Sequence, residues 1–379
     1  MWETARAEPP APTKRAKPAD LTVPGADRVS LPELLRLGVL RDGVQLATTG
    51  IRLPLLGQVI PRIEIEITAP GYRRKVTVRV DQRSPFSFDG AHLTARVNGT
   101  VRDVACRQFV DDGRAPTGMY NFGLLRENGV RSFVFDYHTY CAYSCDFCFK
   151  ESEWEILAFQ ESGPANYTAN FDACLAYVHD HAEDFLTEYD IVWLCTGSIK
   201  NTRLELDRHC RLAAEIRAIG YSGGVYVSQV IPQAIRDDAG YRLDYLNRLK
   251  AAGVSRFNSG VEIVNNEYRR RYVHGYKGTL TFDDYVTVFT DAVAVFGHQQ
   301  VGSCLLAGIE PATDTLRGLE TISALGVVPS PTVLTPFVVK QQGIPFHYDL
   351  DGLVNVHVGF REIIRAYGLP VFSGVFSLA

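Results

Sequence analysis

The sequence predicts an α/β protein in which a partial (β/α)6 barrel follows a small N-terminal β-rich domain. Three observations carry this prediction. Short strands with period-two alternation occupy the first third of the chain. Strand and helix patterns alternate after residue 131, and most of the predicted helices end at a glycine, which favours a helix C-terminus. Repeated βα units form a parallel sheet with right-handed crossovers, and six units rather than eight predict an open barrel.

Length and composition describe a globular chain and argue against a membrane or nucleic-acid role. The 379 residues are 46% hydrophobic and 22% charged, with a formal net charge of −4, which is typical of a protein with a real core. No apolar run approaches the ~20 residues that span a bilayer. The start lacks the apolar stretch of a signal peptide, so we expect a cytoplasmic protein. The triplet Arg269-Arg270-Arg271 is too short to neutralise a nucleic-acid backbone.

Composition and turn signals divide the chain into regions. We predict a disordered tail over 1–20, the small β-rich domain over 21–120, and the barrel with a C-terminal extension over 121–379. A helix is predicted over Leu31–Leu40, because Ser30 and Pro32 suit its N-cap and first turn. The stretch Asp111–Pro116 has the composition of a linker.

The β-rich domain is predicted from alternation and from turn dipeptides. Apolar and polar residues alternate in Ile63–Ile67 and in much of Lys75–Val80, which is typical of half-exposed strands. Asp89-Gly90 and Asn98-Gly99 favour tight turns between such strands. Together these signals predict a small antiparallel β unit.

The barrel is predicted from its βα repeats. The predicted strands are Ser132–Phe135, Ile191–Cys195, Gly224–Val230, Arg256–Glu262, Val301–Ala307 and Thr332–Phe337. The predicted helices are Phe171–Phe185, Leu204–Ile219, Asp237–Ala252, Phe282–Phe296, Thr313–Leu325 and Val354–Tyr367. In barrels of this kind functional residues lie at the C-terminal ends of the strands. We therefore expect the functional site at the edge of the barrel where these strand ends meet.

The strongest chemical signal is a loop with three cysteines directly after the first barrel strand. Cys141, Cys145 and Cys148 have the spacing C-x3-C-x2-C. A [4Fe–4S] cluster normally takes four cysteine ligands, so three thiolates leave one iron open to chelate a substrate or cosubstrate. A Cys3His zinc site that uses His138 is an alternative, although structural zinc sites usually pair their ligands differently. A disulfide framework is disfavoured by the size of the chain.

This spacing resembles the signature motif of the radical S-adenosylmethionine (radical SAM) superfamily. The closest resemblance is to the branch of biotin synthase and 2-iminoacetate synthase. Membership implies a TIM-like partial barrel, a [4Fe–4S] cluster on the three cysteines, and S-adenosyl-L-methionine (SAM) on the open iron. SAM would be cleaved reductively to a 5'-deoxyadenosyl radical that abstracts hydrogen from the substrate. An electron donor such as flavodoxin or ferredoxin is implied as a partner.

The resemblance also assigns SAM contacts residue by residue. The turn Thr196-Gly197-Ser198 resembles the position of the family's Gly-Gly-Glu motif and would bind the SAM amino group, although its glutamate is absent. Glu262 would accept the ribose hydroxyls, and Arg270 would bind the SAM carboxylate, with its arginine neighbours on a solvated helix face. The remaining assigned contacts are with adenine: Phe147, Gly308 and Phe337. No catalytic residue beyond these cofactor contacts is assigned.

The other cysteines bear on whether a second cluster exists. Cys195 occupies the position that in biotin synthases helps to hold a second cluster, but the partner positions there fall near Val227 and Gly302. The remaining thiols are scattered singly in apolar surroundings typical of buried free cysteines: Cys106, Cys174, Cys210 and Cys304. We therefore expect a single cluster and, for Cys195, a buried thiol.

These features predict an enzyme of the radical SAM type that acts on a small molecule, in specialised (natural product) biosynthesis. A radical SAM modifier of a peptide or RNA is the alternative within the same chemistry. A non-catalytic iron–sulfur or zinc-binding module is the alternative from a different class. The reaction that follows hydrogen abstraction is left open between lyase, mutase and oxidoreductase.

Overall fold

The structure is a computed structural model. It describes residues 20–48, 51, 61–109, 123–127, 130–137, 141–143, 145–148, 167–335, 341 and 343–371. Almost all of the predicted tail, the predicted linker Asp111–Pro116 and the predicted adenine contact Phe337 lie outside these residues.

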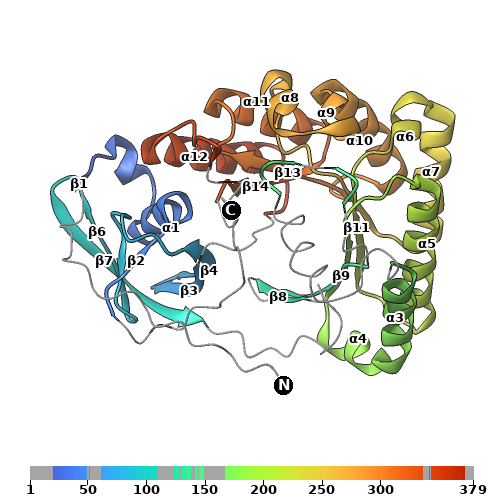
Figure 1. The fold of residues 1–379 in the computed structure, drawn as a ribbon, viewed down its shortest axis with the longest axis horizontal. Helices are drawn as coiled ribbons and strands as arrows, with labels where there is room; N and C mark the ends of the chain where they lie inside the picture. The colour runs from blue at the N-terminus through green and yellow to red at the C-terminus, as the bar shows by residue number, and fades with distance from the viewer. Residues whose placement is uncertain are drawn as a thin grey trace.

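One of the two seven-stranded sheets is the predicted open barrel. Its six parallel strands pair in the order in which they occur in the chain. The strands are β9 (Val130–Phe135), β10 (Ile191–Cys195), β11 (Gly224–Ser228), β12 (Arg256–Asn258), β13 (Val301–Ala307) and β14 (Val328–Val333). A further strand that the sequence reasoning did not predict, β8 (Gly123–Glu127), pairs antiparallel with β9 and covers that edge. The sheet curls, and Figure 1 shows its helices in an arc on the convex side.

Helices follow the strands as the βα pattern predicts. They are α3 (Tyr167–Asp180), α4 (Ala182–Glu188), α5 (Thr202–Ala218), α6 (Gln233–Asp237), α7 (Ala239–Ala251), α8 (Asn266–Tyr272), α9 (Gly275–Thr279), α10 (Phe282–Phe296), α11 (Ala312–Ala324) and α12 (Leu350–Ala366). Alternate strand residues such as Val192, Leu194 and Val225 are fully buried against the helices in one large core. The other set of strand side chains therefore faces the inside of the open barrel.

Four of the six strand predictions were wrong in their bounds: β9 begins at Val130 rather than Ser132, β11 ends at Ser228 rather than Val230, and two others differ by four residues. The strand predicted over Arg256–Glu262 ends at Asn258. Glu262, which has φ 60°, pairs with β13 again, but only as an isolated bridge to Leu305. The last strand begins at Val328 rather than Thr332. Pro329 and Pro331 argue against a central strand, but β14 is the edge strand, where a missing N–H leaves no ladder bond unmade.

The N-terminal β unit forms a second sheet, in the order β2-β5-β6-β7-β3-β4 with β1 beside β6. Its strands are β1 (Asp20–Leu21), β2 (Gln45–Leu46), β3 (Arg62–Ala69), β4 (Tyr72–Arg79), β5 (Ser87–Phe88), β6 (His92–Val97) and β7 (Thr100–Phe109). Asn98 and Gly99 both have positive φ in the turn between β6 and β7, so the predicted tight turn is confirmed. The sheet is not purely antiparallel, since β1 pairs with β6, and β2 with β5, in parallel.

Helix α1 (Leu31–Asp42) begins as predicted, with the Ser30 hydroxyl accepting from the Glu33 N–H. A short 3-10 helix, η1 (Pro24–Arg28), precedes it.

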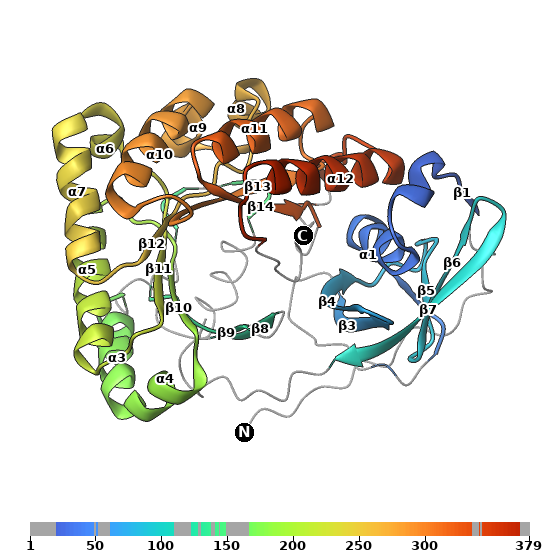
Figure 2. The same ribbon diagram turned by 180° about the vertical axis from the view of Figure 1, so that it is seen from behind.

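The hydrophobic core of the β unit extends onto the barrel, where it includes Ala307 of β13 and Val333 of β14. The core of the β unit includes Leu353, Val354 and Val356 of the final helix α12. The Gly25 N–H donates to Asp351 Oδ1 (2.6 Å), which joins the start of the described chain to α12. Figure 2 shows α1 and α12 side by side between the β unit and the barrel. Among the described residues, none of the helices combines the length and the apolar character that crossing a membrane requires.

Candidate functional site

The cysteine loop lies beyond the C-terminal end of β9, as the barrel rule predicts. The Ala142 N–H donates to the Ser198 carbonyl (2.7 Å) in the turn after β10. On the other side, the Asp146 N–H donates to the Tyr272 carbonyl (3.0 Å), and Cys145 forms an isolated bridge with Val273. The backbone of the loop is therefore fixed both to the second strand and to the segment that follows the fourth.

The three thiols share this loop but differ in exposure. Cys145 is buried, while Cys141 and Cys148 are half-buried, and all three are reduced. Burial raises the pKa of the Cys145 thiol to about 12; the charge of Lys277 opposes this, whereas Glu262, Cys148 and Cys141 add to it. Among the described residues, no three His, Cys, Asp or Glu side chains converge as ligands of one metal ion. Three thiols within electrostatic reach on one anchored loop are nevertheless a donor set that fits an iron–sulfur cluster.

The turn after β10 is supported by a carboxyl group that sequence reasoning missed. Ser198 is buried; its hydroxyl hydrogen-bonds the Glu205 side chain and accepts from the Val230 N–H (3.2 Å). The Ile199 N–H also bonds to Glu205. Burial raises the pKa of Glu205 to about 8, and these hydrogen bonds only partly oppose the rise. Glutamate is common in the first turn of a helix, where it interacts favourably with the helix dipole. The sequence therefore did not indicate that the Glu205 side chain is buried and bonds to the turn before α5.

Glu262 has an uncommon backbone conformation that its neighbours hold in place. It has φ 60°, which is uncommon for a residue with a side chain and costs of order 1–3 kcal/mol unless the surroundings enforce it. Its N–H donates to the Cys304 carbonyl (2.8 Å) and its carbonyl accepts from the Leu306 N–H (2.7 Å), both in β13. These two bonds hold Glu262 beside the fifth barrel strand.

Lys277 of α9 is the charge partner of Glu262, and sequence reasoning did not single it out. Its Nζ lies 2.7 Å from each Glu262 carboxylate oxygen, and it is 6% exposed. Burial lowers the pKa of Lys277, but the Cys145 thiol and Glu262 outweigh that effect, so its pKa lies well above its usual range. The ammonium therefore connects the cysteine loop electrostatically to the predicted ribose ligand.

The arginine triplet in α8 divides differently from the prediction. Arg270, the predicted SAM carboxylate ligand, is exposed. Arg269 is fully buried, so the expectation that it lies on a solvated face was wrong. It donates to the Val261 and Ile263 carbonyls, and its guanidinium lies 4.8 Å from the Tyr285 ring centroid. Arg269 thus fixes the backbone on both sides of Glu262.

Two of the three predicted adenine contacts are described, Gly308 after β13 and Phe147 beside the last cysteine. Gly308 has φ 107°, and a Cβ there would lie 2.3 Å from the Phe346 ring, so the glycine accommodates that ring closely. Phe147 is half-buried against a small cluster that includes Cys145 and Ile263. Glu310 accepts from the Asn265 N–H (2.7 Å), and burial raises its pKa to about 7. Glu310 therefore ties this segment to the chain that follows Glu262.

Neither of the two positions at which a second cluster would need a cysteine carries one, and a side chain at Gly302 would be crowded. Val227 is fully buried among the helices, and a Cβ at Gly302 would lie 2.1 Å from Asn258 Oδ1. Cys195 is exposed at the end of β10, which corrects the expectation that it is buried. Cys304 is half-buried, with its Sγ 3.5 Å from Thr332 Oγ1.

No protein-family model matches the chain, and no curated protein matches it in sequence. Among solved structures, it is similar to methylornithine synthase (PylB), with a TM-score of 0.44, 14% identity and 62% of each chain covered. It is also similar to the FeFe-hydrogenase maturase HydG from Carboxydothermus hydrogenoformans, with a TM-score of 0.45, 14% identity, and 62% of this chain and 51% of that chain covered. A further HydG structure gives a TM-score of 0.44 and 14% identity over 62% of this chain and 49% of that one. The match spans less than two thirds of each of these structures.

Proposed function

We propose that the chain is a radical SAM enzyme that abstracts hydrogen from a small-molecule substrate. The observation that carries this proposal is the position of the C-x3-C-x2-C loop. It lies beyond the first strand of an open barrel, and its backbone is bonded to the turn after β10 and to the segment before Lys277. A pathway of specialised (natural product) biosynthesis, and a flavodoxin or ferredoxin as electron donor, belong to the same proposal.

Cys141, Cys145 and Cys148 would hold the cluster. When bound, a [4Fe–4S] cluster on three thiolates supplies an open iron for the SAM amino and carboxylate groups and an electron for its cleavage. The thiolate is the form that binds metal. The positive charge of Lys277 favours that form at Cys145, where burial opposes it. The protein thus keeps a buried thiol beside a buried cation.

The other residues of the site would orient SAM. The Thr196–Ser198 turn presents backbone groups beside Ala142 of the loop, and Glu205 keeps that turn in place. Glu262 would accept ribose hydroxyls, and the hydrogen bond from Lys277 would hold its carboxylate in position. Rigid support of this kind reduces the cost of ordering ligand and side chains on binding.

Anaerobic reconstitution tests the proposal directly. We expect about four irons per chain and release of 5'-deoxyadenosine from SAM under reductant. Cys148→Ala should abolish SAM cleavage and leave the fold intact, whereas Cys210→Ala, a half-buried cysteine outside the loop, should retain both. One bound zinc per chain with no SAM cleavage would overturn the proposal in favour of a structural metal site. Turnover only with a peptide or RNA would overturn the small-molecule assignment.

A further inference from the structure

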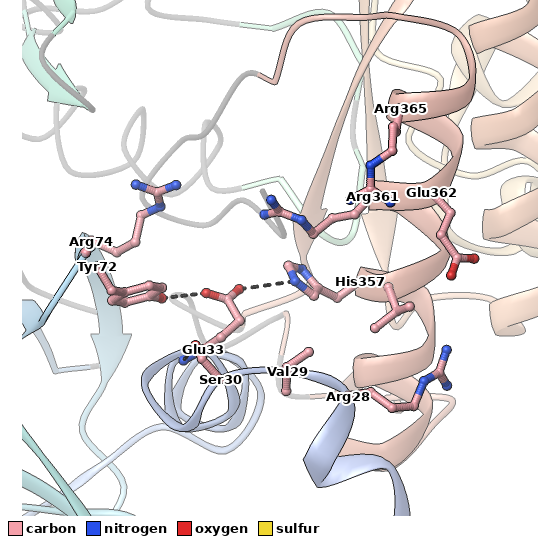
Figure 3. Close-up of a pocket in the computed structure, with 12 residues that line it drawn as sticks. Arg28, Val29, Ser30, Glu33, Tyr72, Arg74, His357, Arg361, Glu362 and Arg365 are labelled. Atoms are coloured by element: carbon pink, nitrogen blue, oxygen red, sulfur yellow. Dashed lines mark hydrogen bonds and ion pairs between the residues drawn. The ribbon is translucent and has the colours of Figure 1, made fainter.

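A cavity lies at the junction of the β unit and the last helix, away from the cysteine loop. It has a volume of about 450 Å³ and is lined by β4, the start of α1 with the chain before it, and α12. This volume is within the range of small-molecule sites. It shares no residue with the cysteine loop, the 196–198 turn or Glu262. Figure 3 shows the side chains that line it.

The floor of the cavity is a buried polar network that leaves no spare negative charge. Tyr72 donates its hydroxyl to Glu33 Oε2 (2.6 Å), and His357 Nε2 lies 3.5 Å from Glu33 Oε1. Arg36, which is 1% exposed, forms an ion pair with the same carboxylate. Burial raises the pKa of Glu33, but Arg36, His357 and Tyr72 together bring it below its usual value. The Glu33 charge is therefore already balanced within the floor.

The described lining of the cavity contains more arginine than glutamate side chains. The four guanidinium groups that line the cavity are those of Arg28, Arg74, Arg361 and Arg365. Over the part of the chain that the structure describes, Arg361 and Arg365 have no ion-pair partner, and Arg28 bonds only to the neutral amide of Asn355. Figure 3 shows Arg74 and Arg361 extending from opposite walls above the Tyr72–Glu33–His357 row. Of the described residues that line the cavity, Glu362 is the one carboxylate besides Glu33.

Such convergence favours an anion of more than one charge. Like charges near one another destabilise a fold unless a counter-charge enters between them. Guanidinium groups present planar pairs of donors that match phosphate oxygens bidentately. The walls are contributed by segments far apart in the chain, so the arginines surround an open hollow and do not lie on one flat face.

We propose that this cavity binds a phosphate-bearing small molecule, with Arg74 and Arg361 as its principal ligands. This site is independent of the proposed radical SAM function, because none of its residues belongs to the cysteine loop or to the SAM contacts. A phosphorylated metabolite bound here would join β4 to α12.

Calorimetric titration of the full-length chain with pyrophosphate, at constant ionic strength, tests the proposal. We expect one site per chain, and at least a tenfold weaker affinity in Arg361→Gln and in Arg74→Gln, since each removes a charge-assisted bidentate contact. Arg102→Gln changes an exposed arginine on β7 by the same charge and should leave affinity unchanged. Circular dichroism identifies any variant that fails to fold, in which case Arg365→Gln replaces it.

Three results would overturn the proposal. The first is the absence of saturable pyrophosphate binding at millimolar concentration. The second is an equal loss of affinity in Arg102→Gln, which would indicate diffuse charge attraction. The third is tighter binding of citrate than of pyrophosphate, which would replace the phosphate assignment with a carboxylate one. SAM cleavage by the reconstituted enzyme is measured separately, so failure of one proposal leaves the other standing.

Discussion

The buried carboxyl of Glu205 makes stability depend on pH in a way that one substitution removes. Glu205 is 1% exposed and hydrogen-bonds Ser198 and the Ile199 N–H. In Glu205→Gln the amide oxygen can accept the same hydrogen bonds, but the side chain no longer titrates. The perturbation therefore removes an ionisation and keeps the geometry of the turn that bonds to the cysteine loop.

The sign of the effect follows from the two pKa values. Burial raises the pKa of Glu205 from 4.5 to about 8 in the folded chain. Between those two pH values the Glu205 carboxyl group is ionised in the unfolded chain and protonated in the folded chain. The free energy of unfolding therefore falls as pH rises. The slope is about 1.4 kcal/mol per pH unit. Between pH 5 and pH 8 the wild type should therefore lose up to about 4 kcal/mol that Glu205→Gln does not lose.

Urea denaturation of the cluster-free chain at half-unit steps from pH 5 to pH 8.5 measures this difference. We expect the variant to gain stability relative to the wild type as pH rises, with the gain levelling off above pH 8. Glu183→Gln, on the exposed face of α4, should show no pH-dependent difference. Parallel curves for wild type and Glu205→Gln would refute the assignment of Glu205 as a buried, protonated carboxyl group.

Three further substitutions test the arrangement around Glu262. Glu262→Gly should weaken SAM binding in calorimetry and lower stability, because an unpaired buried Lys277 ammonium costs more than the roughly 1 kcal/mol of backbone strain that is relieved. Gln299→Gly, also at positive φ, should relieve strain and leave SAM binding unchanged. Lys277→Met should cost about 3–5 kcal/mol in urea denaturation by leaving a buried charge unpaired, and adding Glu262→Gln should recover much of it. Gly308→Ala should cost about 1–3 kcal/mol more than Gly297→Ala, because both have positive φ but nothing crowds Gly297. Equal costs would contradict the crowding.

The order of the barrel strands and the position of the cysteine loop were predictable, because they follow from period and spacing. Helix α10 and strand β13 have the predicted bounds. The helix was predictable because its N-cap, Thr281, and its C-cap, Gly297, are residue types that favour those positions. The hairpin at Asn98-Gly99 was predictable for the same local reason. Signals of this kind depend on neighbouring residues only.

The partners of the site residues were not predictable, because they come from distant segments. Lys277 pairs with Glu262 across 15 positions, and Glu205 reaches Ser198 from the helix that follows the turn. Arg269, Arg270 and Arg271 are identical in type, and only the direction in which α8 lies decides which one is buried. Burial of a charged side chain depends on tertiary contacts that periodicity in a short helix does not reveal.

The core that α12 shares with the β unit has a consequence for synthesis. The last strand of that sheet ends at Phe109, yet part of its core comes from a helix that ends at Ala366. At the ~5–20 residues per second of translation, roughly 15–50 s separate the two. During that interval the apolar face that later meets Leu353 and Val354 stays exposed, so the part of the protein made first is completed last.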